Sequence, residues 1–266
     1  MSDKSIGEVD KLEALARLPT QAHPIASPNG DQIALYYDIT GRNELYVVDL
    51  ETGELEQWSS GDVPRNTMWF VRWGTGGDRI YFHQDNAGNE QNDIYAIDES
   101  GAIEPVFEQE GHSILLDVTD DFLIVGSTQG GQLNLYRNDI ATGNSSQVTD
   151  YARAVTAATV SPSRDLLAYS TNETNDFDNK DVYIAGVDGS DPTNLEIGKV
   201  GAEALPVDWG PHSRCLLVSD NSTDFGRIGI YDLDDEEIEW YGDADCDESP
   251  VALISAPETE KTASPN

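Results

Sequence analysis

The sequence predicts an all-β protein, a β-propeller of about five four-stranded antiparallel blades. The first observation is a unit, residues 26–58, that the chain repeats. It opens with the turn Ser27-Pro28-Asn29-Gly30-Asp31, in which proline presets φ and glycine accepts a positive φ. The second observation is the repeat length. Equivalent positions are Asp31, Asp78, Asp121, Asp165 and Arg214, a spacing of 43 to 49 residues that is typical of propeller repeats.

Short apolar runs follow each turn and predict the strands. In the first unit they are residues 33–37, 44–50 and 55–58, rich in Tyr, Val, Ile and Leu. Such runs are too short and too rich in aromatic and β-branched residues to favour helices. A tight turn, a longer loop and a second tight turn connect the strands, which predicts an antiparallel meander. One such sheet cannot bury both faces alone, so neighbouring sheets must stack.

The chain is expected to contain three segments. They are a helix at residues 1–20, the propeller at 21–254 and a polar tail at 255–266. The blades are expected at about 22–60, 68–108, 112–150, 155–197 and 204–242, followed by a partial sixth strand at 249–254. Because the sixth blade stops after one strand, we expect an incomplete ring. Its open edges would expose apolar faces and favour self-association.

The N-terminal helix is predicted from two features. Ser5 and Glu8 have the spacing of a capping box, and Pro19 ends the segment. Between them, apolar residues recur at helical spacing: Ile6, Val9, Leu12 and Ala16. This apolar face requires a partner, either the edge of the propeller itself or another domain.

The charge balance excludes two classes of partner. The chain has 50 acidic and 15 basic side chains and a formal net charge of −35. Such a surface repels nucleic acid phosphates and anionic lipid, so neither is expected as a partner. Only five residues are lysine, and an acid-rich, lysine-poor composition resembles that of proteins from microbes with molar salt in the cytoplasm. The sequence has no apolar run of membrane-spanning or signal-peptide type, which predicts a cytoplasmic location.

Charged residues recur on the predicted innermost strands. Arg72, Asp117 and Asp208 occupy equivalent positions in three blades, where they would either line a central channel and hold a ligand or metal, or form ion pairs between blades. At the next position, Trp73 and Trp209 are expected to pack between blades. The loops between second and third strands offer five further candidates: Arg42, Asn89, Glu90, Asp176 and Asp178. Residues 175–179 loosely resemble a calcium loop, but a solvated acidic loop is the simpler interpretation.

The turn and strand motifs resemble those of TolB-like, WD-repeat-like propellers. More closely, several runs are similar to the N-terminal propeller of haloarchaeal serine peptidases of the prolyl oligopeptidase family, which includes acylaminoacyl peptidases and dipeptidyl peptidase IV-like enzymes. The runs are Ala22-His23-Pro24, Ser27-Pro28-Asn29-Gly30, Thr40-Gly41-Arg42-Asn43-Glu44-Leu45, Asn89-Glu90-Gln91-Asn92-Asp93 and Asp176-Phe177-Asp178-Asn179. The resemblance covers residues 12 to about 253. It implies a propeller that filters or positions peptides for a separate α/β-hydrolase domain.

No catalytic residue can be assigned from this resemblance. The sequence contains no Gly-x-Ser-x-Gly, the motif that exposes the nucleophilic serine of α/β-hydrolases. No metal or cofactor site is predicted either. Three hypotheses follow: the non-catalytic propeller of a peptidase, with a peptide or a separately encoded hydrolase domain as partner; a stand-alone propeller scaffold that binds protein or ligand; and a propeller hydrolase or lactonase. The genomic sequence downstream of the gene would discriminate the first from the others.

The charge balance predicts that folding depends on salt. Fifty acidic side chains repel one another in dilute buffer, whereas in molar salt the Debye length falls to about 3 Å. We therefore expect the melting temperature to rise steeply from dilute buffer to molar KCl, as followed by circular dichroism. A melting temperature that is unchanged across this range would contradict the expectation.

Overall fold

The computed structural model describes residues 15, 18–65, 68–85, 91–223, 225–242 and 245–250. Within the chain two compact units are distinguished, Met1–Ile114 and Leu115–Asn266, and each is described by itself. The predicted N-terminal helix lies almost entirely outside the described residues, as do residues 251–254 of the predicted sixth strand and the polar tail.

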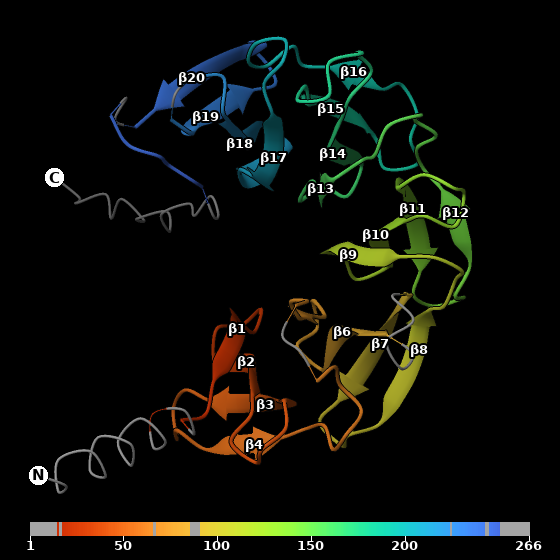
Figure 1. Cartoon of the computed structure of the whole chain (residues 1–266), viewed down its shortest axis with the longest axis vertical. Coiled ribbons are helices and arrows are strands. Elements are labelled where there is room, and N and C mark those ends of the chain that lie inside the picture. Colours follow the sequence, from red (N-terminus) through yellow and green to blue (C-terminus); the bar gives the residue numbers. More distant parts are fainter. Residues whose placement is uncertain are drawn as a thin grey trace, which may run out of the picture. The chain divides into compact units, whose positions relative to one another are not determined.

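The described residues form five four-stranded antiparallel sheets, each built from four consecutive strands in sequence order (Figure 1). Unit 1 contains β1 Gln21–Ala26, β2 Gln32–Tyr37, β3 Glu44–Asp49, β4 Leu55–Gln57, β5 Arg72–Trp73, β6 Arg79–Asp85, β7 Asn92–Asp98 and β8 Ile103–Phe107. The third sheet consists of β9 Ser113–Val118, β10 Phe122–Ser127, β11 Asn134–Asp139 and β12 Ser145–Gln147. The fourth consists of β13 Ala157–Val160, β14 Leu166–Thr171, β15 Asp181–Gly186 and β16 Thr193–Asn194. The fifth consists of β17 Ala204–Trp209, β18 Cys215–Asp220, β19 Arg227–Asp232 and β20 Glu237–Tyr241.

The predicted fold class, an all-β chain of five four-stranded antiparallel sheets, is confirmed. One detail differs, since the sequence predicted helix at the N-terminus alone. A single 3₁₀ turn, Pro211–Ser213, connects β17 to β18, with proline at its start. His212 and Ser213 within it both have positive φ, so the turn does not propagate into a longer helix.

The first turn of a sheet recurs with the same backbone geometry. Gly30 has φ +76°, and its N–H donates to the carbonyl of Ser27 at 2.9 Å. Gly77 repeats this bond in the second sheet. In the fourth sheet Arg164 takes the same position with φ +65°. Three repeats therefore use one turn, and in one of them a non-glycine residue accepts the strained conformation.

A second recurring turn connects the third and fourth strands. In the first and third sheets an aspartate carboxylate accepts the backbone N–H and the hydroxyl of a threonine three residues later. The aspartates are Asp49 and Asp139, and Asp98 plays the same part with Ser100. These hydrogen bonds lower the pKa of each aspartate below its usual value. Part of the acidic composition therefore shapes turns.

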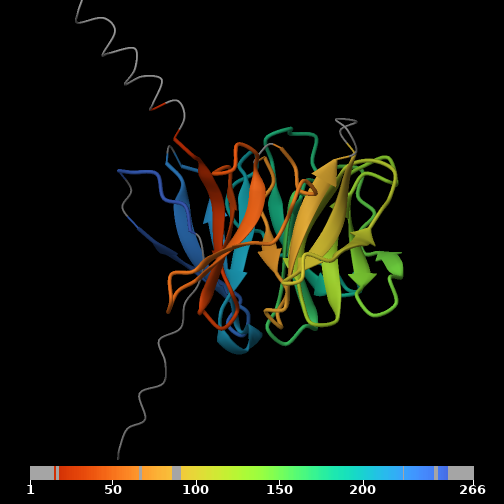
Figure 2. The ribbon, with the colours of Figure 1, turned by 90° about the horizontal axis from the view of Figure 1, so that it is seen from below.

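Apolar side chains bury the faces between successive sheets of one unit. In unit 1, Tyr36 and Leu45 of the first sheet share a core with Phe82 and Ile80 of the second. In unit 2, Ile124 and Leu135 of the third sheet pack with Tyr169 of the fourth. Alternate residues of each strand face these cores. The strands run side by side with turns at one end and longer loops at the other, as Figure 2 shows from a second direction.

Two tryptophans join neighbouring sheets by the same contact. The indole Nε1–H of Trp73, at the end of β5, donates to the carbonyl of Ile25 in β1 at 3.1 Å. The indole Nε1–H of Trp209, at the end of β17, donates to the carbonyl of Thr159 in β13 at 3.0 Å. Both tryptophans are buried. The prediction that this position packs between blades agrees with the geometry, which adds a directional hydrogen bond to the packing.

We expect Trp209→Phe to destabilise unit 2 by about 2–3 kcal/mol, because it removes buried ring volume and leaves the carbonyl of Thr159 without its donor. Denaturant unfolding in high salt measures the change. Tyr241→Phe is the control. Because Tyr241 is 47% exposed, removal of its hydroxyl should change the free energy of unfolding little. Equal destabilisation by the two variants would contradict a special role for the tryptophan.

Candidate functional site

The loops at one end of each sheet are tied together by polar side chains. The loop between second and third strands and the segment leaving the fourth strand both lie at this end, called here the loop end. The carboxylate of Glu44, at the start of β3, accepts hydrogen bonds from Ser59 Oγ at 2.6 Å and Gly61 N–H at 2.9 Å. Two asparagines make equivalent bonds: Asn134 accepts from Tyr151 N–H, and Asn179 accepts from Gly201 N–H.

Arg42, a predicted loop residue, takes part in this bracing. Its guanidinium donates to Glu44 at 3.1 Å and to the carbonyl of Val63 at 2.8 Å. The side chain therefore connects two loops of the first sheet. The predicted residues Asn89 and Glu90 lie outside the described residues.

Asp176 and Asp178 lie in the exposed loop between β14 and β15. The carbonyl of Asp176 accepts the side-chain amide of Asn172 at 2.7 Å, and its carboxylate accepts the N–H of Asp178 at 3.2 Å. These bonds fold the loop back on itself. Both carboxylates remain at the surface, next to the hollow described below.

A groove opens at the loop end of unit 2, between residues 150–153 and residues 172–175, and is called here the loop groove. Its volume is about 340 Å³, at the small end of the range for ligand sites. The lining offers side chains of both charges, amides and an aromatic ring. They are Asp150, Tyr151, Arg153, Asn172, Glu173 and Asn175.

A network of tyrosines supports the loop groove. The hydroxyls of Tyr151 and Tyr169 lie 2.9 Å apart, and the rings of Tyr169 and Tyr183 stack with centroids 5.6 Å apart. The hydroxyl of Tyr183 donates to the carboxylate of Glu173. Burial raises the pKa of Tyr169 and Tyr183, and Glu173 adds to the effect at Tyr183. The phenols thus stay protonated and hold the Glu173 carboxylate in place.

An exposed aromatic residue stands beside the loop groove. Phe177 is 83% exposed, and the guanidinium of Arg153 lies 5.1 Å from the centre of its ring. A side chain of this size in solvent is unfavourable unless something covers it, and the cation over the ring face orients it. Phe177 and the loop groove together form a surface with an apolar part, the phenylalanine ring, and a charged part, the groove.

Asp117, predicted for the first strand of the third sheet, bridges to the fourth sheet. One carboxylate oxygen accepts the N–H of Val118 at 2.8 Å, and the other accepts the N–H of Val160 in β13 at 2.7 Å. Its position supports the interblade alternative of the sequence analysis. Both of these hydrogen bonds come from backbone amides, one in each of the two sheets.

The other two residues of this set are Asp208 and Arg72. Asp208 accepts the N–H of Trp209 at 2.8 Å, which repeats one of the bonds of Asp117. Arg72 belongs to unit 1, and its guanidinium lies 5.0 Å from the ring of Phe70.

A histidine and aromatic cluster in unit 1 was not predicted. The ring of Trp69 lies 5.2 Å from that of His83 and 5.0 Å from that of His112. Asn92 Nδ2 lies 3.2 Å from His112 Nδ1. Burial lowers the pKa of His83 to about 4, and the charge of Arg72 contributes in the same direction. His83 is therefore a neutral, buried side chain at neutral pH.

Three further observations concern the described residues alone. They contain no group of three or more His, Cys, Asp or Glu side chains placed to hold a metal ion. Within the same residues, no helix is long and apolar enough to cross a bilayer. Among the described residues, neither Cys215 nor Cys246 forms a disulfide bond.

Tyr151, Glu173 and His83 were not among the candidate residues predicted from the sequence. The signal for the first two was weak, since a tyrosine after a fourth strand and a glutamate in a loop are common in any propeller. For His83, the usable signal was its place at the end of a short apolar strand, since Ile80 to His83 are all buried.

We expect His83 to make the stability of unit 1 depend on pH. Its pKa is about 4 in the folded protein, against 6.5 when unperturbed, so below pH 6.5 the unfolded chain binds a proton that the folded chain does not. Stability should fall from pH 6.5 to about pH 4, by roughly 3 kcal/mol, and level off below. Denaturant unfolding as a function of pH measures the slope.

His83→Phe should remove the contribution of about one proton from the pH dependence of the unfolding free energy. This result is expected whether or not the substitution changes stability at pH 7. The control is His212→Asn, because His212 is exposed and asparagine tolerates its φ of +60°. If the slope survives His83→Phe unchanged, another group carries it.

The fold is that of TolB-like propellers. No protein-family model matches the sequence, and no curated protein matches it. Among solved structures, TolB from Acinetobacter baumannii is 18% identical, with a TM-score of 0.61 over 82% of this chain and 53% of that chain. Oligogalacturonate lyase from Vibrio parahaemolyticus is 16% identical, with a TM-score of 0.64 over 81% and 63%.

A puromycin-hydrolyzing peptidase from Mycobacterium tuberculosis is 13% identical, with a TM-score of 0.62 over 84% of this chain and 38% of that chain. The chain thus spans about half the length of the TolB structure and less of the peptidase. At these identities the likenesses show the fold alone. The five sheets of this chain are those of a TolB-like β-propeller, an architecture found in TolB, in oligogalacturonate lyase and in peptidase propeller domains.

Proposed function

We propose that the chain is the non-catalytic propeller portion of a serine peptidase of the prolyl oligopeptidase family, which positions a peptide for a hydrolase domain outside this sequence. The loop groove is the observation that carries the proposal. It combines the Glu173 carboxylate, the Arg153 guanidinium and the amide of Asn175 on loops that internal hydrogen bonds brace.

These groups suit the two ends and the backbone of a short peptide. A carboxylate held by a tyrosine network binds an N-terminal ammonium by charge-assisted hydrogen bonds. The exposed amide side chain of Asn175 offers both a donor and an acceptor to peptide N–H and C=O groups. Phe177 can cover an apolar side chain next to them. The likeness to the propeller part of a peptidase supports the same assignment.

Two alternatives remain. A stand-alone scaffold that binds a protein is favoured by the likeness to TolB and by the exposure of Phe177. A propeller enzyme is suggested by the likeness to oligogalacturonate lyase, one structure of which is a complex with manganese. Of its candidate residues, Asp117 is occupied by backbone amides of two strands. We therefore place it third.

The test is peptide binding by the purified chain in molar KCl, measured by calorimetry. Short peptides with a free N-terminus should bind several-fold more tightly than their N-acetylated forms. Glu173→Gln should remove most of this preference, about a tenfold loss of affinity. Glu99→Gln, an exposed residue of unit 1, is the control and should bind as the parent does. If acetylated and free peptides bind equally, Glu173 does not read the N-terminus.

A parallel incubation tests the non-catalytic part of the proposal. We expect no release from peptide nitroanilides and no serine labelled by a fluorophosphonate. A labelled serine whose substitution abolishes both signals would overturn this part, whatever the result of the binding assay.

A further inference from the structure

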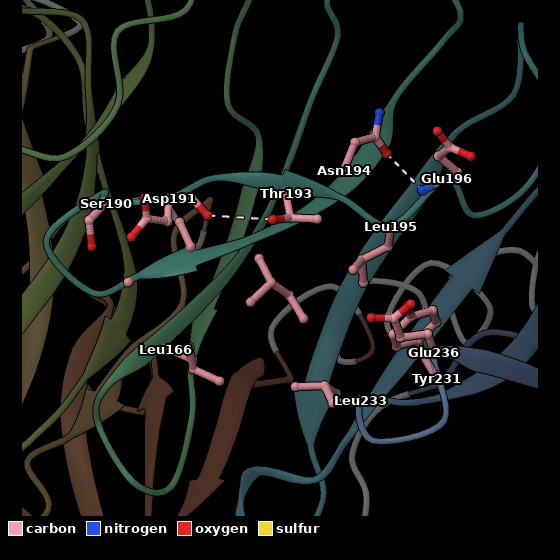
Figure 3. A pocket seen from close by; sticks show the side chains of 13 residues that line it. Leu166, Ser190, Asp191, Thr193, Asn194, Leu195, Glu196, Tyr231, Leu233 and Glu236 are labelled. Carbon is pink, nitrogen blue, oxygen red and sulfur yellow. Dashed lines mark hydrogen bonds between the residues drawn. The ribbon is translucent and has the colours of Figure 1, made fainter.

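A second hollow lies in unit 2 at the opposite end of the fourth sheet from the loop groove. Its volume is about 670 Å³, and it runs between the fourth and fifth sheets. Leu166 of the fourth sheet lies on one side, and Tyr231 of the fifth sheet and the adjacent Leu233 lie on the other (Figure 3). Ile184 of the fourth sheet also lines the hollow. This hollow is called here the side groove. Nothing in the proposed function uses it.

The floor of the side groove is apolar. Leu166, Ile184, Leu195 and Leu233 are partly buried hydrophobic residues that pack against the core shared by the two sheets. Their outer surfaces remain open to the groove. A ligand that presents methylene groups would bury this apolar surface, which is favourable in water.

Three carboxylates surround this floor: Asp191, Glu196 and Glu236. All three residues are exposed, and none of them forms an ion pair with another described residue. Among the described residues that line the groove there is no lysine or arginine. Each of the three has a positive φ, between +50° and +55°. The rim therefore offers negative charge that the described part of the chain does not neutralise.

Tyr231 connects the floor to the rim. The residue is only 9% exposed, yet it lines the groove, and Figure 3 shows it beside Glu236. Its hydroxyl forms no hydrogen bond with any residue that the structure describes. Burial raises the pKa of Tyr231, and the charge of Glu236 acts in the same direction. The ring is thus mostly buried while the hydroxyl meets the groove, where its oxygen can accept a hydrogen bond from a ligand.

We propose that the side groove binds a primary alkylammonium group. The ammonium would donate to the Glu236 carboxylate and to the Tyr231 hydroxyl oxygen, while its methylene chain lies on Leu195 and Leu233. Free alkylamines and the lysine side chain of a peptide or protein share this chemistry. Net negative charge alone would attract any cation, but an apolar floor next to the carboxylate selects a cation with an alkyl chain.

The experiment compares hexylammonium, ammonium and hexanol, titrated into the chain in KCl of constant ionic strength and followed by NMR. Hexylammonium should bind at least tenfold more tightly than either of the others, and the shifted resonances should belong to Tyr231, Leu195 and Leu233. Equal affinities for hexylammonium and ammonium would mean that the apolar floor does not contribute to binding. Equal affinities for hexylammonium and hexanol would mean that the carboxylates do not contribute. Either result overturns the proposal.

Two variants test the named contacts. Glu236→Gln should weaken hexylammonium about tenfold, and Tyr231→Phe a few-fold, while the affinity for hexanol stays the same. The matched control is Glu237→Gln, the exposed neighbour in β20 that does not line the groove. Equal losses from Glu236→Gln and Glu237→Gln would overturn the site.

Nα-acetyl-lysine amide separates the two sources. If it binds more tightly than hexylammonium, the ligand is a lysine of a peptide or protein, and if it binds more weakly, the ligand is a free amine. Because no residue is shared with the loop groove, Glu173→Gln should leave these titrations unchanged. The side groove and the proposed function can therefore fail independently.

Discussion

The indole hydrogen bond from one sheet to the backbone of the sheet before it is the contact on which each unit depends. A four-stranded sheet of this size exposes two faces, and one face can be buried only by the next sheet. Apolar packing alone would allow neighbouring sheets to shift relative to each other. Trp73 and Trp209 fix the relative position of two sheets, because each indole N–H donates to one particular carbonyl, that of Ile25 or Thr159. Asp117 does the same with a backbone N–H of β13.

Once the sheets are held in register, the loops can carry sites. At the loop end, Glu44, Asn134 and Asn179 each bind the segment that leaves the fourth strand. In the loop groove, Asn134 holds the backbone of Tyr151, and the tyrosine network supports the same lining. The side groove has a different origin. It is the space left where the short outer strand β16, two residues long, leaves the fourth and fifth sheets incompletely covered.

The acidic side chains of this chain occur in two kinds of environment. Glu44, Asp49, Asp117 and Asp139 accept backbone amides and shape turns and sheet contacts. Asp191, Glu196 and Glu236 surround a groove without any ion pair to a described residue. A net charge does not distinguish these roles, because the number of charges carries no information about which of them have hydrogen-bond donors nearby.

Local pattern was enough to predict the sheets. The proline and glycine turns, the short runs of β-branched and aromatic residues and the repeat length are properties of neighbouring residues, so they predicted five antiparallel sheets without reference to packing. The equivalence of Trp73 and Trp209 was also visible, because a repeat places equivalent residues in equivalent environments.

The sites depended on contacts that the sequence does not contain. Glu173 and Tyr183 are ten residues apart and lie on a loop and a strand, while Tyr151 comes from the preceding sheet. Tyr231 and Leu166 are separated in the sequence by more than one repeat, yet both line the groove between the fourth and fifth sheets. The sequence by itself determined the repeat, the strands and the charge. The tertiary structure alone decided which side chains meet, because burial and hydrogen bonding between sheets depend on the distances that packing creates.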